Sequence, residues 1–222
     1  MLVAVPYAFI IAVLANNRAV VEGFIVKDGN CTQATANLPF VENFEVEKYL
    51  GKWYELERYE QDYERNLECV TAEYRSSQPI GMLEVKNRGF LAKNQTYHTF
   101  SGLGAFSEDP AAGNATVAKL NITFGKARNA SAYWVVDTDY INYAIVYSCT
   151  TFLESDQAVE GYWLLARTSK LPDDPQVIER VKHLRSTYFE PSHMRVTNQT
   201  DELCPTEPGL PPAPSSIILP PL

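Results

Sequence analysis

From Trp53 onward, hydrophobic and polar residues alternate along the chain with a period of two rather than 3.6. Val70, Ala72 and Tyr74, for example, are separated by polar residues, which is the pattern of a strand with one buried face. We expect eight such strands, at Trp53–Glu60, Cys69–Ser76, Met82–Arg88, Gln95–Gly104, Ala115–Gly125, Ala132–Thr138, Ile141–Thr150 and Glu160–Thr168. Short strands at hairpin spacing predict an all-β fold, an eight-stranded antiparallel up-and-down β-barrel.

The seventh expected strand is unusual because residues 143–147 are apolar on both faces. A covering element follows it in the sequence, where Asp174 and Pro175 supply N-terminal helix signals. Apolar residues then recur at helical spacing, namely Val177, Val181, Leu184 and Tyr188, with Ile178 beside them. We therefore expect one C-terminal α-helix that packs on the outside of the barrel and ends before Pro191.

The two ends of the chain differ in composition from this central part. Residues 2–15 are almost wholly apolar and uncharged, a length that suits a signal-peptide core and is short for a membrane span. We expect a signal peptide over residues 1–23, cleaved between Ala15 and Gly23, although a buried N-terminal strand or helix is an alternative. Residues 206–222 are rich in Pro and predict a flexible tail. The folded domain is then expected over residues 24–205.

Sequons for N-glycosylation are more frequent than the roughly one or two that chance predicts. The candidate acceptors are Asn30, Asn94, Asn114, Asn121, Asn129 and Asn198. Asn121 alternates with the apolar residues Leu120 and Ile122, so we expect it on the outer face, where a glycan has room. The excess favours a secreted, extracellular glycoprotein.

The four cysteines are Cys31, Cys69, Cys149 and Cys204, and none forms a Cys-x-x-Cys motif. Zinc binding and thioredoxin-like redox chemistry are therefore not expected. Two disulfides formed in an oxidising compartment are the economical interpretation. The sequence arithmetic leaves three pairings open.

Charge and motif content argue against several other functions. The formal net charge of −8 and the scattered basic residues make a nucleic-acid partner improbable. His98, His183 and His193 show no metal-ligand spacing, and the chain has no Gly-x-Ser-x-Gly or phosphate-binding loop. We expect neither enzymatic activity, nor a metal, nor a cofactor.

Three short motifs become informative when they are taken together. Gly51 permits a tight turn into the first strand, and Trp53 is large enough to plug the narrow end of a barrel. Thr138-Asp139-Tyr140 predicts a tight turn whose Asp binds backbone amides. Arg167 can lie over the Trp53 ring as a cation–π lid. Taken alone, each motif is also typical of an ordinary strand opening, hairpin turn or strand end.

In this order and spacing the motifs resemble those of the lipocalin family, particularly its apolipoprotein D group, which includes Lazarillo and the bilin-binding pigment carriers. The resemblance extends over roughly Cys31 to Cys204. It is carried by Asn43-Phe44-x-Val46-x-Lys48-Tyr49-Leu50-Gly51-x-Trp53-Tyr54-Glu55, Tyr133-Trp134, Thr138-Asp139-Tyr140-x-Asn142-Tyr143-Ala144-x-Val146-Tyr147-Ser148-Cys149 and Leu165-Ala166-Arg167.

The resemblance implies a pairing of the first cysteine with the third and of the second with the fourth, hence Cys31–Cys149 and Cys69–Cys204. It also implies a secreted carrier that holds a small hydrophobic molecule, such as a fatty acid, sterol, retinoid or bilin, in the barrel. The expected partners are that molecule and a peripheral membrane or lipoprotein surface, and the expected state is a monomer or weak oligomer.

Candidate ligand-binding residues are aromatic or amide side chains placed among aliphatic ones. We expect Tyr74, Asn87, Trp134, Tyr147 and Trp163 to point into the barrel, with plain core packing as the alternative for each. Asn87 is the most informative, because a buried polar group costs free energy unless a ligand or water satisfies it.

Two other functions remain open at this stage. The number of sequons and the tail are also compatible with an extracellular adhesion protein that acts through its surface, with the cavity secondary. A lipocalin-type isomerase would need a free cysteine.

Overall fold

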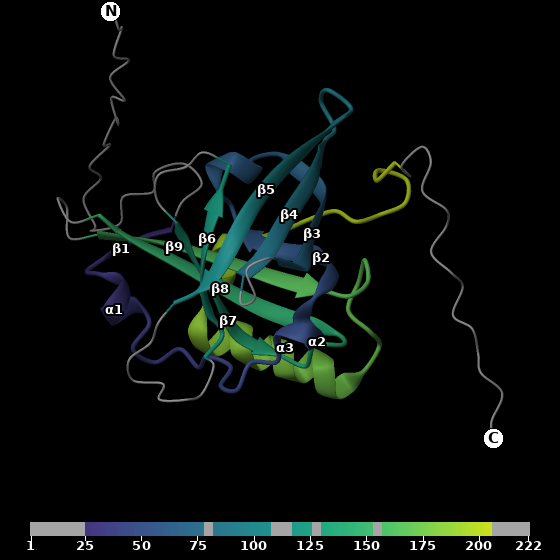
Figure 1. The fold of residues 1–222 in the computed structure, drawn as a ribbon. Coiled ribbons are helices and arrows are strands. Elements are labelled where there is room, and N and C mark those ends of the chain that lie inside the picture. The colour runs from purple at the N-terminus through teal and green to yellow at the C-terminus, as the bar shows by residue number, and fades with distance from the viewer. Residues whose placement is uncertain (1–24, 78–81, 108–116, 126–129, 153–156, 206–222) are drawn as a thin grey trace, which may run out of the picture.

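The computed structural model describes residues 25–77, 82–107, 117–125, 130–152 and 157–205 of the 222-residue chain. Its centre is a closed antiparallel barrel in which each strand pairs with the next and the last pairs with the first (Figure 1). The barrel strands are β2 (Gly51–Tyr59), β3 (Leu67–Ser77), β4 (Met82–Leu91), β5 (Thr96–Phe106), β6 (Lys119–Phe124), β7 (Ser131–Thr138), β8 (Tyr143–Phe152) and β9 (Gln157–Ala166). The eight-stranded barrel predicted from the alternating pattern is confirmed.

Two short edge strands and several short helices were not predicted. β1 (Ile25–Asp28) pairs with β9, and β10 (Met194–Val196) pairs with β2. The short helical segments are α1 (Cys31–Ala34), α2 (Val46–Tyr49), η1 (Asp62–Glu64) and η2 (Pro191–His193). Elements of three or four residues carry too few positions for a periodic pattern to reveal them.

One strand boundary shifts because turn chemistry overrides the pattern: β8 begins at Tyr143 rather than Ile141. The described part of β6 is Lys119–Phe124, and Ala115 lies outside the described residues. Ile141 lies in the β7–β8 turn, where its side chain is 73% exposed.

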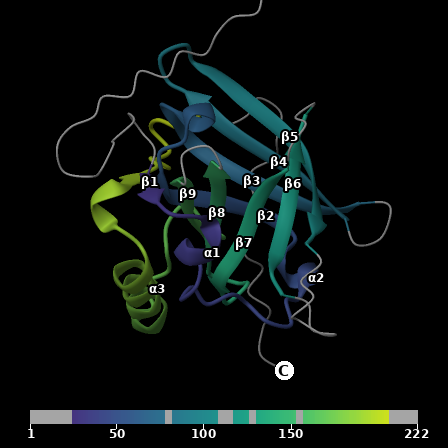
Figure 2. The same cartoon turned by 90° about the vertical axis from the view of Figure 1, so that its left-hand side faces the viewer.

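Helix α3 (Pro175–Tyr188) covers the outside of β8 and β9, as Figure 2 shows. Asp174 caps it by accepting a hydrogen bond from the Gln176 N–H at 2.8 Å, and Pro175 occupies the first turn. Its buried residues Val177, Val181 and Leu184 pack on the outward side chains of β8. The predicted cover for the doubly apolar strand is therefore confirmed.

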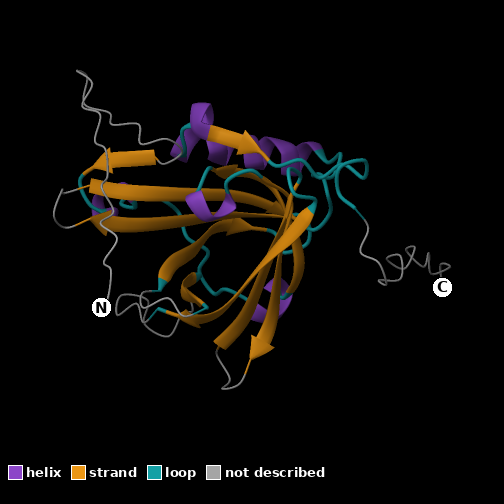
Figure 3. Ribbon diagram, turned by 90° about the horizontal axis from the view of Figure 1, so that it is seen from above, coloured by secondary structure: helices purple, strands orange, loops and turns teal. Residues whose placement is uncertain are grey.

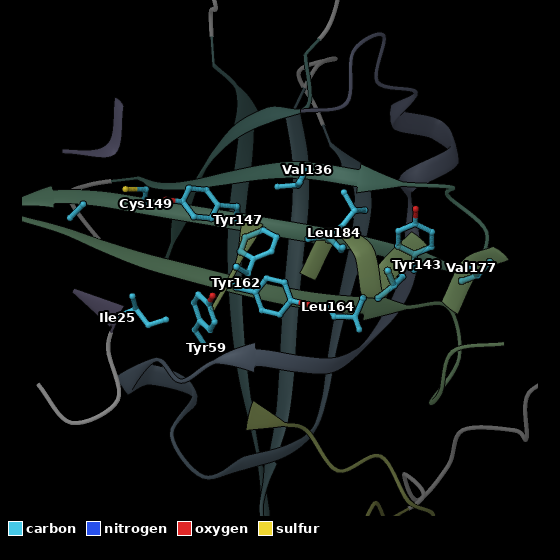
Figure 4. Close-up of a cluster of buried hydrophobic side chains, with 14 residues drawn as sticks. Ile25, Tyr59, Val136, Tyr143, Tyr147, Cys149, Tyr162, Leu164, Val177 and Leu184 are labelled. Carbon is cyan, nitrogen blue, oxygen red and sulfur yellow. The ribbon is translucent and has the colours of Figure 1, made fainter. Parts of the chain in front are cut away.

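Buried side chains form two clusters on opposite faces of the barrel wall. The outer cluster lies between α3 and the sheet and includes Tyr143, Tyr147 and Tyr162 (Figure 4). The inner cluster lies inside the barrel, around Trp53 and Val146. Alternation along β8 divides its residues between the clusters, since Ala144 and Val146 face inward whereas Tyr143, Ile145 and Tyr147 face outward.

Two disulfides join the terminal segments to the barrel. They connect Cys31 to Cys149 and Cys69 to Cys204, which is the pairing that the family resemblance implies. Because these bonds use all four cysteines, no thiol is left for the isomerase hypothesis.

The C-terminal segment also completes the barrel wall where β2 and β3 diverge. β3 pairs with β2 only from Gly51 to Tyr54, and beyond that point β10 pairs with β2 from Glu57 to Tyr59. Figure 3 shows the strands from above, with the long helix along the outside of the barrel. Gln199 then bridges β2 and β3, donating from Nε2 to the Glu55 and Val70 carbonyls at 2.8 and 2.7 Å. β10 and Gln199 thus close the wall between β2 and β3.

Several sequence predictions concern the termini and the sequons. The predicted signal peptide and Pro-rich tail, as well as Asn114 and Asn129, lie outside the described residues. Asn94, Asn121 and Asn198 are exposed, Asn121 on the outward face of β6, while the half-buried Asn30 caps α1. Among the described helices, none has the length and apolarity to cross a bilayer.

Candidate ligand-binding site

One end of the barrel is closed by Trp53 and Arg167. Trp53 is fully buried and donates from Nε1 to the Tyr49 carbonyl at 2.8 Å. The Arg167 guanidinium carbon lies 3.7 Å from the centroid of the Trp53 ring, a cation–π distance. Its nitrogens also donate to the carbonyls of Lys48 at 2.7 Å and Leu50 at 2.9 Å. These contacts join the segment before β2 to the end of β9.

The turn between β7 and β8 supplies the remaining partners of this base. Asp139 Oδ1 accepts hydrogen bonds from the N–H groups of Ile141, Asn142 and Tyr143 at 3.1, 2.7 and 3.1 Å. Tyr140 adopts a left-handed φ of 67°, and its carbonyl accepts from Arg167 Nε at 2.9 Å. The short polar turn therefore fixes the position of the guanidinium over Trp53.

Gly51 allows the chain to enter β2 beside that guanidinium. Its φ of +96° lies in the region that residues with a Cβ disfavour. An added Cβ would come within 3.5 Å of Arg167 Nη1. The glycine of the first motif is thus required by backbone conformation.

Beyond the base, the barrel holds a cavity of about 310 Å³. This volume is at the lower end of the range typical of small-molecule sites. Its walls are mostly apolar, contributed by Val70, Ala72, Phe100, Ile122, Phe124 and Leu165. Such walls favour an apolar ligand or portion of a ligand.

Three tyrosines lie between the base and the cavity: Tyr49 packs on Trp53, whereas Tyr74 and Tyr133 line the cavity. Their hydroxyls form a chain in which Tyr133 bridges Tyr49 at 2.7 Å and Tyr74 at 2.6 Å. Burial raises the pKa of all three phenols above the usual value, so they remain neutral at physiological pH. The hydrogen bonds among the three hydroxyl groups satisfy these buried polar atoms without solvent.

Two buried carboxylates line the cavity farther along. Glu55 on β2 is 2% exposed and Glu64 on η1 is 4% exposed. Glu64 Oε2 accepts a hydrogen bond from Trp163 Nε1 at 3.0 Å. Burial, reinforced by the nearby charge of Glu55, raises the pKa of Glu64 to about 8. This carboxyl group therefore changes charge near physiological pH.

Arg58 compensates Glu55 from a fully buried position. It contacts Glu55 Oε1 through Nη1 at 2.6 Å and Glu60 through Nη2 at 3.0 Å. Nη2 also donates to the backbone carbonyl of Glu64 at 2.7 Å, and Thr197 donates to the Glu55 carboxylate. Burial raises the pKa of Glu55, whereas Arg58 and Thr197 lower it. Arg58 thus reaches the main chain of Glu64 while its charge is matched by Glu55 and Glu60.

Asn87 and Tyr63 are the remaining distinctive groups of the lining. The Asn87 Oδ1 atom is buried and has no hydrogen-bond partner among the described residues. Tyr63 follows β2 on η1 and is 53% exposed, with its ring 6.5 Å from that of Phe100. Both residues belong to the cavity lining.

Comparison with known proteins places this architecture in a family. Residues 44–199 match the family model described as "Lipocalin-like domain". The chain is a lipocalin.

Relatives among characterised proteins agree with that assignment. The chain is 34% identical to apolipoprotein D of Bos taurus over 202 residues, which covers 90% of this chain and 98% of the relative. It is 30% identical to the Lazarillo protein of Schistocerca americana over 178 residues, 78% of each chain. This lipocalin is apolipoprotein D-like and belongs to a family of non-enzymatic carriers.

Solved structures support the fold. Insecticyanin from the tobacco hornworm Manduca sexta matches with a TM-score of 0.67 and 22% identity, over 82% of this chain and 93% of its own. Lobster apocrustacyanin A1 matches with a TM-score of 0.60 and 19% identity, over 80% and 92%. At these identities the likeness shows the barrel alone.

Within this lipocalin, three of the five candidate ligand residues line the cavity and two do not. Tyr74, Asn87 and Trp163 are in the lining. The inward placement of Trp134 and Tyr147 was wrong, because both side chains pack on the outer cluster. The Tyr147 hydroxyl donates to Glu160 at 2.7 Å.

The acidic part of the cavity lining could not be predicted from the sequence pattern. Glu55, Glu64 and Tyr63 lie in or beside a charge-rich stretch that is typical of a solvated surface. A signal for Glu64 was absent because η1 is a three-residue turn with no period. The described residues hold no cluster of three or more potential metal ligands.

Proposed function

We propose that this lipocalin is a secreted carrier that reversibly binds one small hydrophobic molecule in the barrel cavity, without a covalent step. The observation that carries the proposal is a cavity of about 310 Å³ with apolar walls and a closed base. The candidate ligands are a fatty acid, a sterol, a retinoid and a bilin. Discrimination among them depends on the polar groups that face the cavity.

The physical driving force is burial of apolar surface. A ligand that buries about 300 Å² of apolar area gains roughly 7 kcal/mol at about 25 cal/mol per Å². The loss of translational and rotational freedom subtracts from this gain. We therefore expect a Kd in the micromolar range.

Secretion is supported by the chemistry of the chain. The two disulfides are typical of an oxidising compartment. The apolar residues 2–15 suit a signal-peptide core, and the six sequons suit passage through the secretory pathway. We propose residues 24–205 as the mature folded domain, with a surface that includes glycans at the exposed sequons.

The positions of the tryptophans allow a direct test. Trp163 lines the cavity, whereas Trp134 lies outside the barrel and Trp53 is buried at the base. Delipidated protein should show saturable quenching of its fluorescence by at least one of the four ligand classes. Trp163→Phe should remove most of the quenching, and the matched control Trp134→Phe should retain it.

Two results would contradict the proposal. One is the absence of saturable binding by every member of the panel, checked by calorimetry as well as by fluorescence. The other is quenching that survives Trp163→Phe and disappears in Trp134→Phe, because the ligand would then lie on the outer face.

A further inference from the structure

The polar atoms that face the cavity near η1 are chiefly hydrogen-bond acceptors. They belong to the carboxyl groups of Glu55 and Glu64, both in the cavity lining. Among the described residues that line the cavity there is no Lys, Arg or His. A ligand ammonium placed here meets the carboxyl groups of Glu55 and Glu64, and no basic side chain stands beside them in the described lining.

The nearby cations are already engaged with other carboxylates. Arg58 is paired with Glu55 and Glu60, and Arg195 is paired with Glu60 and Glu68. With Glu64, the cluster therefore holds two guanidinium groups and four carboxyl groups, those of Glu55, Glu60, Glu64 and Glu68. The cluster therefore has an excess of acidic groups, and Glu64 is the member that borders the empty space without an ion pair in the described chain.

Glu64 is also incompletely satisfied. Trp163 donates to its Oε2, while Oε1 accepts no hydrogen bond from the described residues. A buried carboxylate with an unfilled acceptor is unfavourable unless a donor reaches it. Glu64 thus offers an open acceptor to a donor group of a ligand in the cavity.

We propose that the cavity is selective for amphipathic amines, with the ligand ammonium donating to the Glu64 carboxylate and its apolar body among the aliphatic and aromatic walls. This inference rests on the proposed carrier function and specifies its ligand class. A ligand carboxylate at the same place would face Glu55 and Glu64 with no free cation to accept it. Opposite charge in a desolvated site favours the amine.

Proton exchange gives this binding mode a distinctive signature. The groups that face Glu64 are Glu55 and Arg58 on β2, Glu60 directly after it, Tyr63 on η1, Tyr74 on β3 and Trp163 on β9. Because burial and Glu55 hold the pKa of Glu64 near 8, this group is mostly protonated at pH 7 without ligand. An ammonium ion that pairs with it displaces this proton into the buffer.

The test uses three probes with the same ten-carbon chain and different head groups: decylamine, decanol and decanoate. Calorimetric titration of the full-length protein at pH 7 should give a Kd for decylamine at least tenfold lower than that for decanoate. Titrations in phosphate and in Tris, which differ in ionisation enthalpy, should show release of up to about one proton with decylamine and none with decanol.

Glu64→Gln tests the site itself and retains a hydrogen-bonding side chain. In this variant the preference for decylamine over decanol should fall to within threefold, and proton release should vanish. Glu73→Gln removes the same charge from the outer surface and should leave both unchanged. Circular dichroism and thermal melting establish that each variant is folded.

The outcomes separate the two proposals. Binding of decanoate as tight as that of decylamine overturns the amine inference and leaves the carrier function standing. An amine preference that persists in Glu64→Gln overturns the assignment to this carboxylate. Failure of all three probes, together with the fatty acid, sterol, retinoid and bilin panel, overturns the carrier function as well.

Discussion

The two ends of the barrel interior differ in how their polar atoms are partnered. At the base, the Arg167 guanidinium donates to backbone carbonyls and the tyrosine hydroxyls bond to one another. Near η1, Glu64 has one hydrogen bond and Asn87 Oδ1 has none among the described residues. Satisfied polar groups stabilise the folded chain on their own, whereas unsatisfied groups need a further molecule. We propose that this contrast separates the residues that stabilise the fold from those that bind the ligand.

The largest expected effect comes from removing the plug of the base. Trp53→Ala should lower the free energy of unfolding by about 3–5 kcal/mol, because it leaves a cavity beneath Arg167 and removes the cation–π contact. Urea denaturation and the melting temperature measure this loss. The order of preference among the ligands that still bind should not change. Unchanged stability would remove the assignment of Trp53 as the plug.

A smaller loss of unfolding free energy is expected when the hydrogen bonds among the three tyrosine hydroxyls are broken. Tyr133→Phe removes the bridging hydroxyl and leaves the Tyr49 and Tyr74 hydroxyls without their partner. The expected cost is about 1–3 kcal/mol in urea denaturation. Tyr54→Phe is the control, since that ring lies beside Lys52 on the outer wall and its loss of a hydroxyl should cost less than about 0.5 kcal/mol. Equal losses of stability in the two variants would show that the hydrogen bonds among the three tyrosine hydroxyls contribute nothing to stability.

For the region near η1, the protonation of Glu64 is tested by the dependence of the unfolding free energy on pH. In the folded protein Glu64 keeps its proton up to about pH 8, whereas in the unfolded chain it loses it near pH 4.5. The folded state therefore binds more protons between these values, so this stabilisation is full below about pH 4.5 and is lost as the pH rises to about 8. Relative to Glu64→Gln, the wild-type protein should lose about 1 kcal/mol between pH 6 and 7.

Unfolding free energies of both proteins, measured in urea at several pH values from 5 to 9, test this sign. A wild-type protein that gains stability relative to Glu64→Gln as the pH rises would mean that Glu64 is an ordinary ionised carboxylate. In that case the protein's own donors and cations would already satisfy the carboxylates near η1, and the two ends of the barrel interior would not differ.

The sequence predicted the parts of the molecule that repeat a pattern. Alternation along the strands gave the barrel, and the doubly apolar β8 together with the helical spacing in α3 gave the outer cover. The same property of β8 made its faces ambiguous, and Tyr147 was therefore placed on the wrong side. Trp134 was misplaced for the same reason, because its neighbours Tyr133 and Val135 are also apolar and face inward.

The binding features that escaped prediction depend on tertiary structure. Glu64 enters the cavity because a three-residue turn folds back over the end of β2, and Arg58 is buried because the C-terminal segment closes the gap between β2 and β3. Neither event leaves a local periodic signature. Asn87 was recognisable because it is a polar residue on an otherwise apolar face.

The most direct test of the central claim, that the cavity is the binding site, is to fill it and to compare the result with an equal change outside. Ile122 lines the cavity on β6, and Leu103 on β5 is 47% exposed on the outer wall. Calorimetric titration of Ile122→Trp and Leu103→Trp with the tightest ligand of the panel compares the same added side chain on the two faces. We predict that Ile122→Trp weakens binding at least tenfold while remaining folded, and that Leu103→Trp binds as the wild type does. Undiminished binding in folded Ile122→Trp would contradict the account.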